Sequence, residues 1–224
     1  MNWVMPRSPL LWLSFMFSCT VLVLIGHAAV SVGSDSNNAH ILQELSQPPT
    51  EFSAMCMWRK DGKTSKAQVF VKGDRYRLEH WGGLQTDLGL AGVTIVRLDL
   101  QQVWYIYSQR RLVLSVPAEA RDVLPYSVIL DGEVRRTFIG DAEVGVQPAQ
   151  LYEVEVVSQN GQYERYYEWV DPERQVLLKL LSQDRDWRIE YDHVVLSTQP
   201  DYFFEPPLGY RTIEAQRSDR KSNS

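Results

Sequence analysis

The chain has 224 residues, of which 44% are hydrophobic and 23% are charged, and its formal net charge is −5. This composition is ordinary for a folded protein and excludes wholesale disorder. The acidic balance argues against a nucleic acid or an anionic membrane surface as the main partner, because both attract basic patches.

The first 30 residues have the pattern of a secretory signal peptide. Arg7 is their one charged side chain, residues 10–25 are mainly apolar, and Gly26 and Ala28 offer small residues for cleavage. The alternative is an uncleaved membrane anchor, although a spanning helix needs about 20 apolar residues. We therefore expect a periplasmic protein, anchored in the inner membrane if this segment is retained.

The two cysteines predict a fold without an internal disulfide. Cys19 lies inside the export signal, which leaves Cys56 alone in the exported chain. Cys56 sits in an apolar, strand-like run, where a small buried side chain is a commoner role than a reactive thiol. Packing must then hold the fold together.

Residues 31–50 read as a leader to the folded domain. Ile41, Leu42 and Leu45 give residues 38–46 the pattern of a short amphipathic helix, which Pro48 and Pro49 end.

From Glu51 onward the pattern becomes that of a mainly β protein. Runs rich in Val, Tyr, Trp, Phe and Ile alternate with polar residues and are cut by turn residues at short intervals. About eleven strands are expected, at residues 52–58, 66–72, 75–81, 93–98, 103–108, 112–116, 133–141, 151–158, 162–170, 175–182 and 187–196. Their short connections predict a curved antiparallel sheet.

Two connections are expected to differ from simple turns. Residues 84–91 are predicted as a loop or short helix. Residues 118–131 form a longer connection, in which Pro125 allows at most two short helical turns. With residues 38–46, these are the segments available to cover a face of the sheet. We expect residues 217–224 to be a frayed polar tail.

Alternation predicts one apolar and one wet face for most strands. Residues 103–107 and 176–181 are apolar on both faces, so each is either covered on its second face or lines a cavity. An ordinary filled core and a ligand cavity both remain open from the pattern alone.

The sequence offers no constellation for catalysis or metal binding. His80 and His193 lie on aromatic strand faces and are interpreted as structural histidines, and Glu164 and Glu168 as solvated acids on an outward face. No spacing of His, Cys or acidic residues matches a metal site, and no nucleophile elbow or phosphate-binding loop occurs. We expect no enzymatic activity and no cofactor.

The order and spacing of several segments resemble the periplasmic lipoprotein-carrier superfamily, the LolA/LolB-like proteins, and their outer-membrane lipoprotein-sorting relatives. These segments are residues 71–79, 93–99 with 103–106, 139–144, 166–171 and 203–210. The resemblance spans residues 51–211. It implies an unclosed β-barrel with a few short covering helices, whose apolar cavity takes lipoprotein acyl chains.

The resemblance also implies an arginine near an early strand that tethers a lid over the cavity. Arg75, Arg77 and Arg97 are all candidates. The chain departs from the carriers in lacking an obvious lipid anchor and in its aromatic C-terminal half.

Two functions follow as hypotheses. The first is a carrier that binds a lipid or a lipoprotein acyl chain in a concave cavity. Its walls would come from Tyr76, Leu78, Trp104, Ile106, Tyr152, Val154, Trp169, Ile189 and Tyr191. The second is a module with a filled core that binds or senses another envelope protein. The expected organisation is a signal peptide or anchor at 1–30, a leader at 31–50, a half-barrel domain at 51–213 and a flexible tail at 214–224.

Overall fold

The protein is built on one sheet of twelve strands, which confirms the mainly β class expected from the sequence. The computed structural model describes residues 51–60, 62–158, 161–184 and 186–216, all within one compact unit, Ser34–Ser224. The strands are β1 (Glu51–Lys60), β2 (Lys63–Lys72), β3 (Arg75–Thr86), β4 (Gly89–Arg97), β5 (Gln102–Tyr107), β6 (Leu112–Pro117), β7 (Glu133–Val144), β8 (Gln147–Val157), β9 (Tyr163–Val170), β10 (Leu177–Ser182), β11 (Trp187–Leu196) and β12 (Arg211–Glu214).

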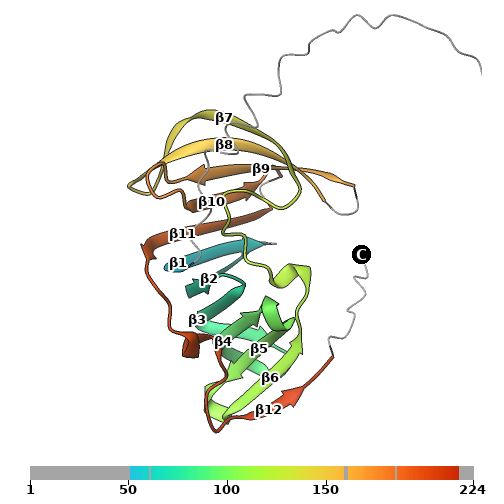
Figure 1. The fold of residues 1–224 in the computed structure, drawn as a ribbon. Coiled ribbons are helices and arrows are strands. Elements are labelled where there is room, and N and C mark those ends of the chain that lie inside the picture. The colour runs from blue at the N-terminus through green and yellow to red at the C-terminus, as the bar shows by residue number, and fades with distance from the viewer. Residues whose placement is uncertain (1–50, 61, 159–160, 185, 217–224) are drawn as a thin grey trace, which may run out of the picture. The chain divides into compact units, whose positions relative to one another are not determined.

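Two antiparallel meanders meet at β1. The order across the sheet is β12-β6-β5-β4-β3-β2-β1-β11-β10-β9-β8-β7. Strands β1 to β6 run outward on one side, and β7 to β11 return so that β11 pairs with β1 (Figure 1). Strands β7 and β12 form the two edges of the order, so the curved sheet is open, as expected for an unclosed barrel.

One face of the sheet, called the inner face below, carries the main core. Alternation along β1 places Phe52, Ala54 and Cys56 on it, each at most 4% exposed. The same cluster includes Val103 of β5 and Leu180 of β10, although these strands are far apart in the sheet order. The curvature brings their inner side chains together, so apolar burial there stabilises the bend itself.

The connection from β6 to β7, residues 118–132, crosses this inner face and is called the strap below (Figure 1). It contains one 3-10 helix, η3 (Ala120–Asp122), which agrees with the expectation of at most two short helical turns. Leu124 and Tyr126 pack against the main cluster, and Val128 is buried in a neighbouring cluster. The strap is therefore part of the core and not a surface loop.

Aromatic side chains hold the strap at the centre of the inner face. The Tyr126 hydroxyl donates to the Gly73 carbonyl at 3.2 Å, and the Tyr191 hydroxyl donates to the Pro125 carbonyl at 2.7 Å. The rings of Tyr76 and Tyr126 meet edge to face, with centroids 5.6 Å apart. The chain's own side chains thus fill the space above this part of the sheet.

The opposite face, called the outer face, has a second apolar cluster. Residues 199–210, called the belt below, cross it between β11 and β12 and include η4 (Asp201–Phe204) (Figure 1). Phe204 is fully buried in a cluster formed with Ile95, Trp104, Ile106 and Val113. The belt therefore covers the second face of β5, one of the two alternatives that its sequence allowed.

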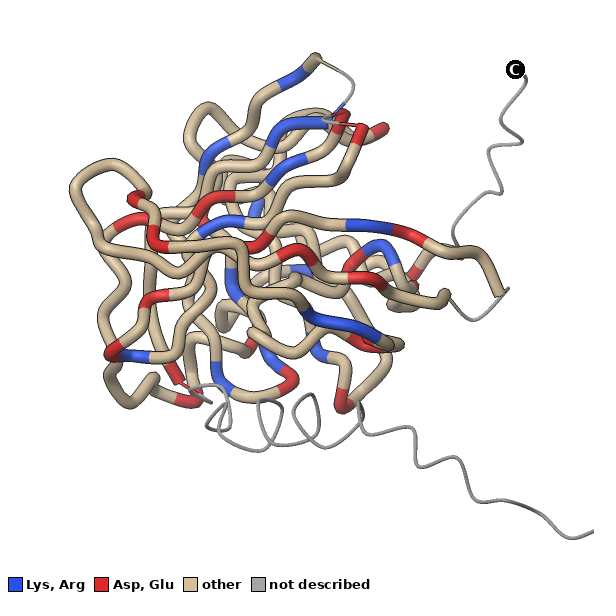
Figure 2. The backbone as a smooth tube through the Cα atoms, turned by 90° about the horizontal axis from the view of Figure 1, so that it is seen from above, with Lys and Arg blue, Asp and Glu red and all other residues tan. Residues whose placement is uncertain are grey.

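Charged residues of both signs are interspersed along the strands (Figure 2). Ion pairs between neighbouring strands follow from this arrangement. On the outer face, the Lys179 ammonium lies 3.3 Å from a carboxylate oxygen of Glu190 and 4.7 Å from the centroid of the Trp169 ring.

The prediction of a loop or short helix at residues 84–91 is wrong. Strand β3 continues to Thr86 and β4 begins at Gly89, so this segment is a hairpin. The disruption lies earlier, at Gly82 and Gly83, whose φ angles are 83° and 81°. There the pairing of β3 with β4 shifts register, because paired glycines allow a bulge as readily as a turn.

Strand β12 is absent from the sequence prediction. It pairs in parallel with β6, and all of its four residues are exposed. Four exposed residues carry no apolar alternation, so only the pairing identifies the strand. The belt carries the chain from the end of β11 across the sheet to this edge, where β12 pairs with β6.

The expected signal peptide, leader and short helix at residues 38–46 lie outside the described residues. Within the described part of the chain, no helix has the length and apolarity to cross a bilayer. The remaining helical elements there are the 3-10 turns η1 (Leu98–Leu100) and η2 (Ser108–Arg110).

We predict that Phe204→Ala lowers the free energy of unfolding by about 3–5 kcal/mol, because it leaves a cavity beneath the belt. The matched control is Tyr202→Ala, since the Tyr202 side chain is 72% exposed in the same 3-10 turn. We expect the control to change stability by less than about 0.5 kcal/mol. Urea denaturation of the three proteins measures both values, and similar losses would contradict a packed belt.

Candidate functional site

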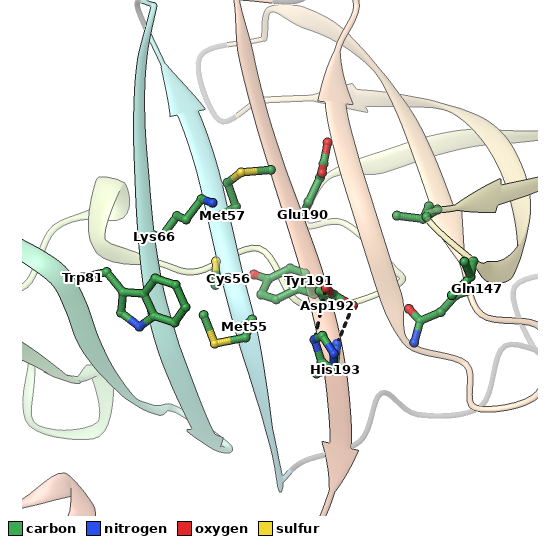
Figure 3. A pocket seen from close by; sticks show the side chains of 13 residues that line it. Met55, Cys56, Met57, Lys66, Trp81, Gln147, Glu190, Tyr191, Asp192 and His193 are labelled. Carbon is green, nitrogen blue, oxygen red and sulfur yellow. Dashed lines mark hydrogen bonds and ion pairs between the residues drawn. The ribbon is translucent and has the colours of Figure 1, made fainter.

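A groove of about 540 Å³ lies over the outer face of β1, β2 and β11 (Figure 3). Met55 and Met57 of β1 form its floor. Met57 pairs across the ladders with Lys66 of β2 and Glu190 of β11, so these side chains share its face. The other lining residues are Cys56, Trp81, Val144, Gly145, Val146, Gln147, Tyr191, Asp192 and His193. The volume falls in the range of small-ligand or side-chain binding pockets.

The tip of the β7–β8 hairpin forms one wall of the groove. Val144 pairs with Gln147 across a two-residue turn, and Gly145 there has a φ of 63°. Val144 packs against the main core, whereas Val146 is 96% exposed. The tip is thus anchored by Val144 and presents the apolar side chain of Val146 at the rim.

Trp81 forms the opposite wall. Figure 3 places it across β1 and β11 from Gln147. Its side chain is 63% exposed and also lines a second cavity of about 410 Å³. A largely exposed tryptophan between two hollows is suited to partner contacts, since tryptophan is enriched among the residues that dominate binding energies.

A β-bulge on β11 provides the polar end of the groove. His193 has a φ of 52°, and its N–H donates to Asp192 Oδ1 at 2.8 Å. Its Nδ1 lies 3.1 Å from Asp192 Oδ2. The bulge turns His193 outward, away from buried Tyr191, so the expectation that it lies on an aromatic strand face is wrong. The regular alternation used for that expectation does not continue through a bulge.

His80 is the structural histidine that the sequence suggested. Its Nε2 lies 2.8 Å from the Thr94 hydroxyl, and its ring packs edge to face with Trp58. Burial lowers the pKa of His80 to about 4, so this ring is neutral at physiological pH.

Cys56 is the buried small side chain expected from its sequence context, with 1% of its surface exposed. Burial raises the pKa of its thiol to about 12. The thiol stays protonated at neutral pH, so Cys56 does not supply a thiolate nucleophile to the groove. Within the described residues, no group of three or more His, Cys, Asp or Glu could hold a metal ion.

The nine residues expected to line an acyl cavity do not surround one space. Tyr76, Leu78, Ile189 and Tyr191 lie in the main inner core, and Tyr152 and Val154 lie in a neighbouring inner cluster with Val128. Trp104 and Ile106 face outward beneath the belt. Trp169 pairs with Lys179 of β10, and its ring, which also packs against the main cluster, lies 4.7 Å from the Lys179 ammonium.

Met55, Met57, Trp81 and Val146 line the groove but were not among the residues predicted from the sequence. One signal was present, because an aromatic residue directly before the Gly82-Gly83 pair marks a position where a strand is interrupted. Met55 and Met57 share a face of β1 by simple alternation, whereas Val146 reaches them only through the tertiary position of the β7–β8 hairpin tip.

The three arginines considered as lid tethers all bind one segment, the belt. Arg75 Nη1 donates to Asp201 Oδ1 at 3.3 Å, and Arg77 Nη1 donates to the Phe203 carbonyl at 3.1 Å. Arg97 reaches the next carbonyl, as described below. Lys72 adds a fourth cation, 2.9 Å from Asp201 Oδ1. This hydrogen bond holds the pKa of Asp201 below its usual value.

Arg97 makes the most buried of these contacts. Its Nε and Nη2 each donate to the Asp99 carboxylate at 2.8 Å, and its Nη1 donates to the Phe204 carbonyl at 3.3 Å. The same Nη1 pairs with Glu205. The bidentate bond from Arg97 lowers the pKa of Asp99. The segment that these arginines hold lies on the outer face, whereas the strap lies on the inner face.

Some solved structures resemble this chain in fold, although its sequence matches no described family. No family model matches the sequence, and no curated protein matches it. The structure of MucB is similar, with 14% identity and a TM-score of 0.51, over 80% of this chain and 66% of that chain. This chain therefore spans about two thirds of the length of MucB. At this identity the likeness concerns the fold alone.

Two further solved structures match less closely. An uncharacterized conserved protein from Thermus thermophilus is 13% identical, with a TM-score of 0.48 over 79% of this chain and 98% of that chain. A LolA superfamily protein from Nitrosomonas europaea is 11% identical, with a TM-score of 0.37 over 75% of this chain and 97% of that chain. The name of this second neighbour belongs to the superfamily that the sequence resembles.

We predict that Arg97→Met lowers the free energy of unfolding by about 2 kcal/mol, because it removes hydrogen bonds of a charged donor that is 8% exposed. Arg75→Met is the matched control, since Arg75 is 32% exposed and its partner Asp201 is 73% exposed. We expect a smaller loss for the control, and one that added salt screens. Chemical denaturation at low and high salt measures the difference, and equal effects would argue against this ranking.

Proposed function

We propose that this protein is a non-enzymatic binding module of the cell envelope, which contacts an apolar segment of another envelope protein through the groove on its outer face. The observation that carries the proposal is the filled inner face. Phe52, Tyr76 and Tyr191 are at most 4% exposed beneath the strap. A ligand on that side would first have to displace buried aromatic packing.

The groove itself supports recognition of apolar side chains. Its floor of two methionines can adapt to different shapes, since methionine is unbranched and flexible. Trp81 and Val146 are exposed on opposite walls, and Lys66, Glu190 and Asp192 give the rim both signs of charge. An apolar centre within a polar rim is the usual anatomy of a protein interface.

The similarity in fold to MucB agrees with this proposal, because MucB has been solved in complex with MucA(peri). Export to the periplasm remains our inference from residues 1–30. It would place the groove in the compartment where such a partner is found.

The proposal predicts that a photo-crosslinking residue at position 81 or 57 captures a protein in envelope fractions. The matched control is a crosslinker at Tyr163, which is 77% exposed near the β8–β9 turn and lies outside the groove. Mass spectrometry identifies the captured species. Capture of the same proteins from all three positions, or of none, would contradict a specific role for the groove.

Once a partner is identified, we expect Trp81→Ala to weaken its binding at least tenfold, as is common for a tryptophan in an interface. Tyr163→Ala should leave the affinity unchanged. Titration calorimetry with the identified partner measures both constants.

A second candidate function is the carriage of a lipid or a lipoprotein acyl chain on the inner face. It is favoured by the aromatic floor formed by Phe52, Tyr76 and Tyr191, which movement of the strap would expose. Six of the nine residues expected as cavity walls lie on this face.

Solvent extraction of the purified protein followed by mass spectrometry separates the two functions. A carrier should yield a stoichiometric lipid, and added acyl chains should raise its melting temperature. The binding module that we favour should yield no stoichiometric lipid and show no such shift.

A further inference from the structure

A buried group of three charges joins the strap to the sheet. Arg136 of β7 donates from Nη1 to Glu168 of β9 and from Nη2 to the Val128 carbonyl of the strap. Its Nε and Nη2 also donate to the two oxygens of Glu133, each at 2.8 Å. Glu133 in turn accepts a hydrogen bond from the Leu130 N–H at 3.1 Å. Two backbone groups of the strap are therefore held by this group.

The position of Glu168 departs from the sequence interpretation, which placed it with Glu164 on a solvated outward face. Glu168 pairs across the ladder with Leu180 and Tyr152, which are both inner-face residues. Its side chain has no exposed surface. Alternation along β9 was assigned to the wrong face, because tyrosine and tryptophan occur on both sides of this strand.

The charges of this group do not balance when both acids are ionised. Arg136 keeps its positive charge at all relevant pH values, so two carboxylates would leave one net negative charge. The side chains of Arg136, Glu133 and Glu168 are only 2%, 3% and 0% exposed. An unpaired charge in such a site costs more than the uptake of a proton.

Glu168 is the acid that holds this proton. Its Oε1 is buried and has no hydrogen-bond partner within the described residues, so it is the oxygen free to be protonated. Burial raises the pKa of Glu168 to about 8, although Arg136 opposes the shift.

We propose that Glu133, Arg136 and Glu168 form a proton-linked anchor for the strap, which holds the inner face closed while one proton is bound and loosens when that proton is lost. This inference does not depend on which molecule occupies the outer groove. In this proposal, a titratable group controls access to the inner face.

The other groups around the anchor do not neutralise it. On β8, the Tyr152 ring lies beneath the Arg136 guanidinium, with 5.1 Å between the guanidinium carbon and the ring centroid. Burial raises the pKa of Tyr152 above its ordinary value, so its hydroxyl is neutral near pH 7. On β9, Tyr166 donates its hydroxyl to Glu164. On β10, the facing residue is Leu180. The acid of the strap closest in sequence, Asp131, is exposed.

The direction of the pH effect follows from the two states of Glu168. In the closed state its pKa is about 8, whereas an exposed carboxyl in an open strap has an ordinary value near 4.5. The closed state therefore binds the proton more tightly. Its advantage is complete below about pH 4.5, falls as the pH rises, and is lost above about pH 8.

Hydrogen exchange of the full-length protein tests the proposal. Exchange of strap amides 118–132 is compared between wild type and Glu168→Gln at the same pH, which cancels the intrinsic pH dependence of exchange. The glutamine stands for the protonated acid. We expect the wild-type to variant ratio of opening constants to rise by about tenfold per pH unit between pH 6 and 8, and to level off above. A ratio that stays constant with pH would overturn the proposal.

Two controls separate a local anchor from general effects. Glu153→Gln makes the same change on β8, on the face opposite Tyr152, and should behave as wild type. Amides of β2 and β3 should show no matching change in ratio, since a parallel change there would mean global unfolding and would overturn a local anchor. Circular dichroism verifies that each variant is folded.

A second variant keeps the test decisive if Glu168→Gln does not fold. Glu133→Gln leaves one acid and one arginine, so Glu168 can ionise at lower pH without a net charge. Once intrinsic exchange rates are divided out, we expect the opening constants of the strap amides in this variant to stay constant between pH 6 and 8. A persisting rise would show that the charge count of the three groups does not set the effect.

Discussion

The whole structure depends on covering both faces of one open, curved sheet. A sheet of this kind that carries apolar side chains on each face must bury both, and helices usually do this in mixed folds. Here two extended segments serve instead, the strap on the inner face and the belt on the outer face. Neither segment has enough regular structure to satisfy its own backbone, so polar anchors from the sheet accompany the apolar contacts.

The two anchors differ in a way that matters for their behaviour. The belt is held by four cations at the accessible edge of a cluster, where Asp201 and Glu205 are well exposed. Such contacts depend weakly on pH near neutrality, because the hydrogen bond from Lys72 holds the pKa of Asp201 below its usual value. The strap is held by one arginine and two acids in a closed site. In that closed site, charge balance requires one of the two acids to bind a proton. The inner face is therefore the face whose coverage can respond to pH.

Much of the fold follows from local pattern, and the departures have local causes. Alternation identifies the strands around Cys56 and Tyr76 correctly, because their apolar side chains face a single core. It fails at Gly82 and at His193, where bulges insert residues that the period of two does not count. It also fails for β12, whose exposed residues carry no pattern at all.

The site was less accessible to prediction than the fold, for a related reason. The predicted cavity walls were chosen as apolar strand residues, and most of them are apolar because the strap or the belt covers them. A segment such as residues 118–132 shows its leucine, valine and tyrosine in the sequence, but not the distant face on which they pack. Binding surfaces have to remain uncovered, so the informative residues are those that the chain leaves exposed despite their chemistry. Trp81 and Val146 meet this criterion, and their proximity arises from tertiary structure alone.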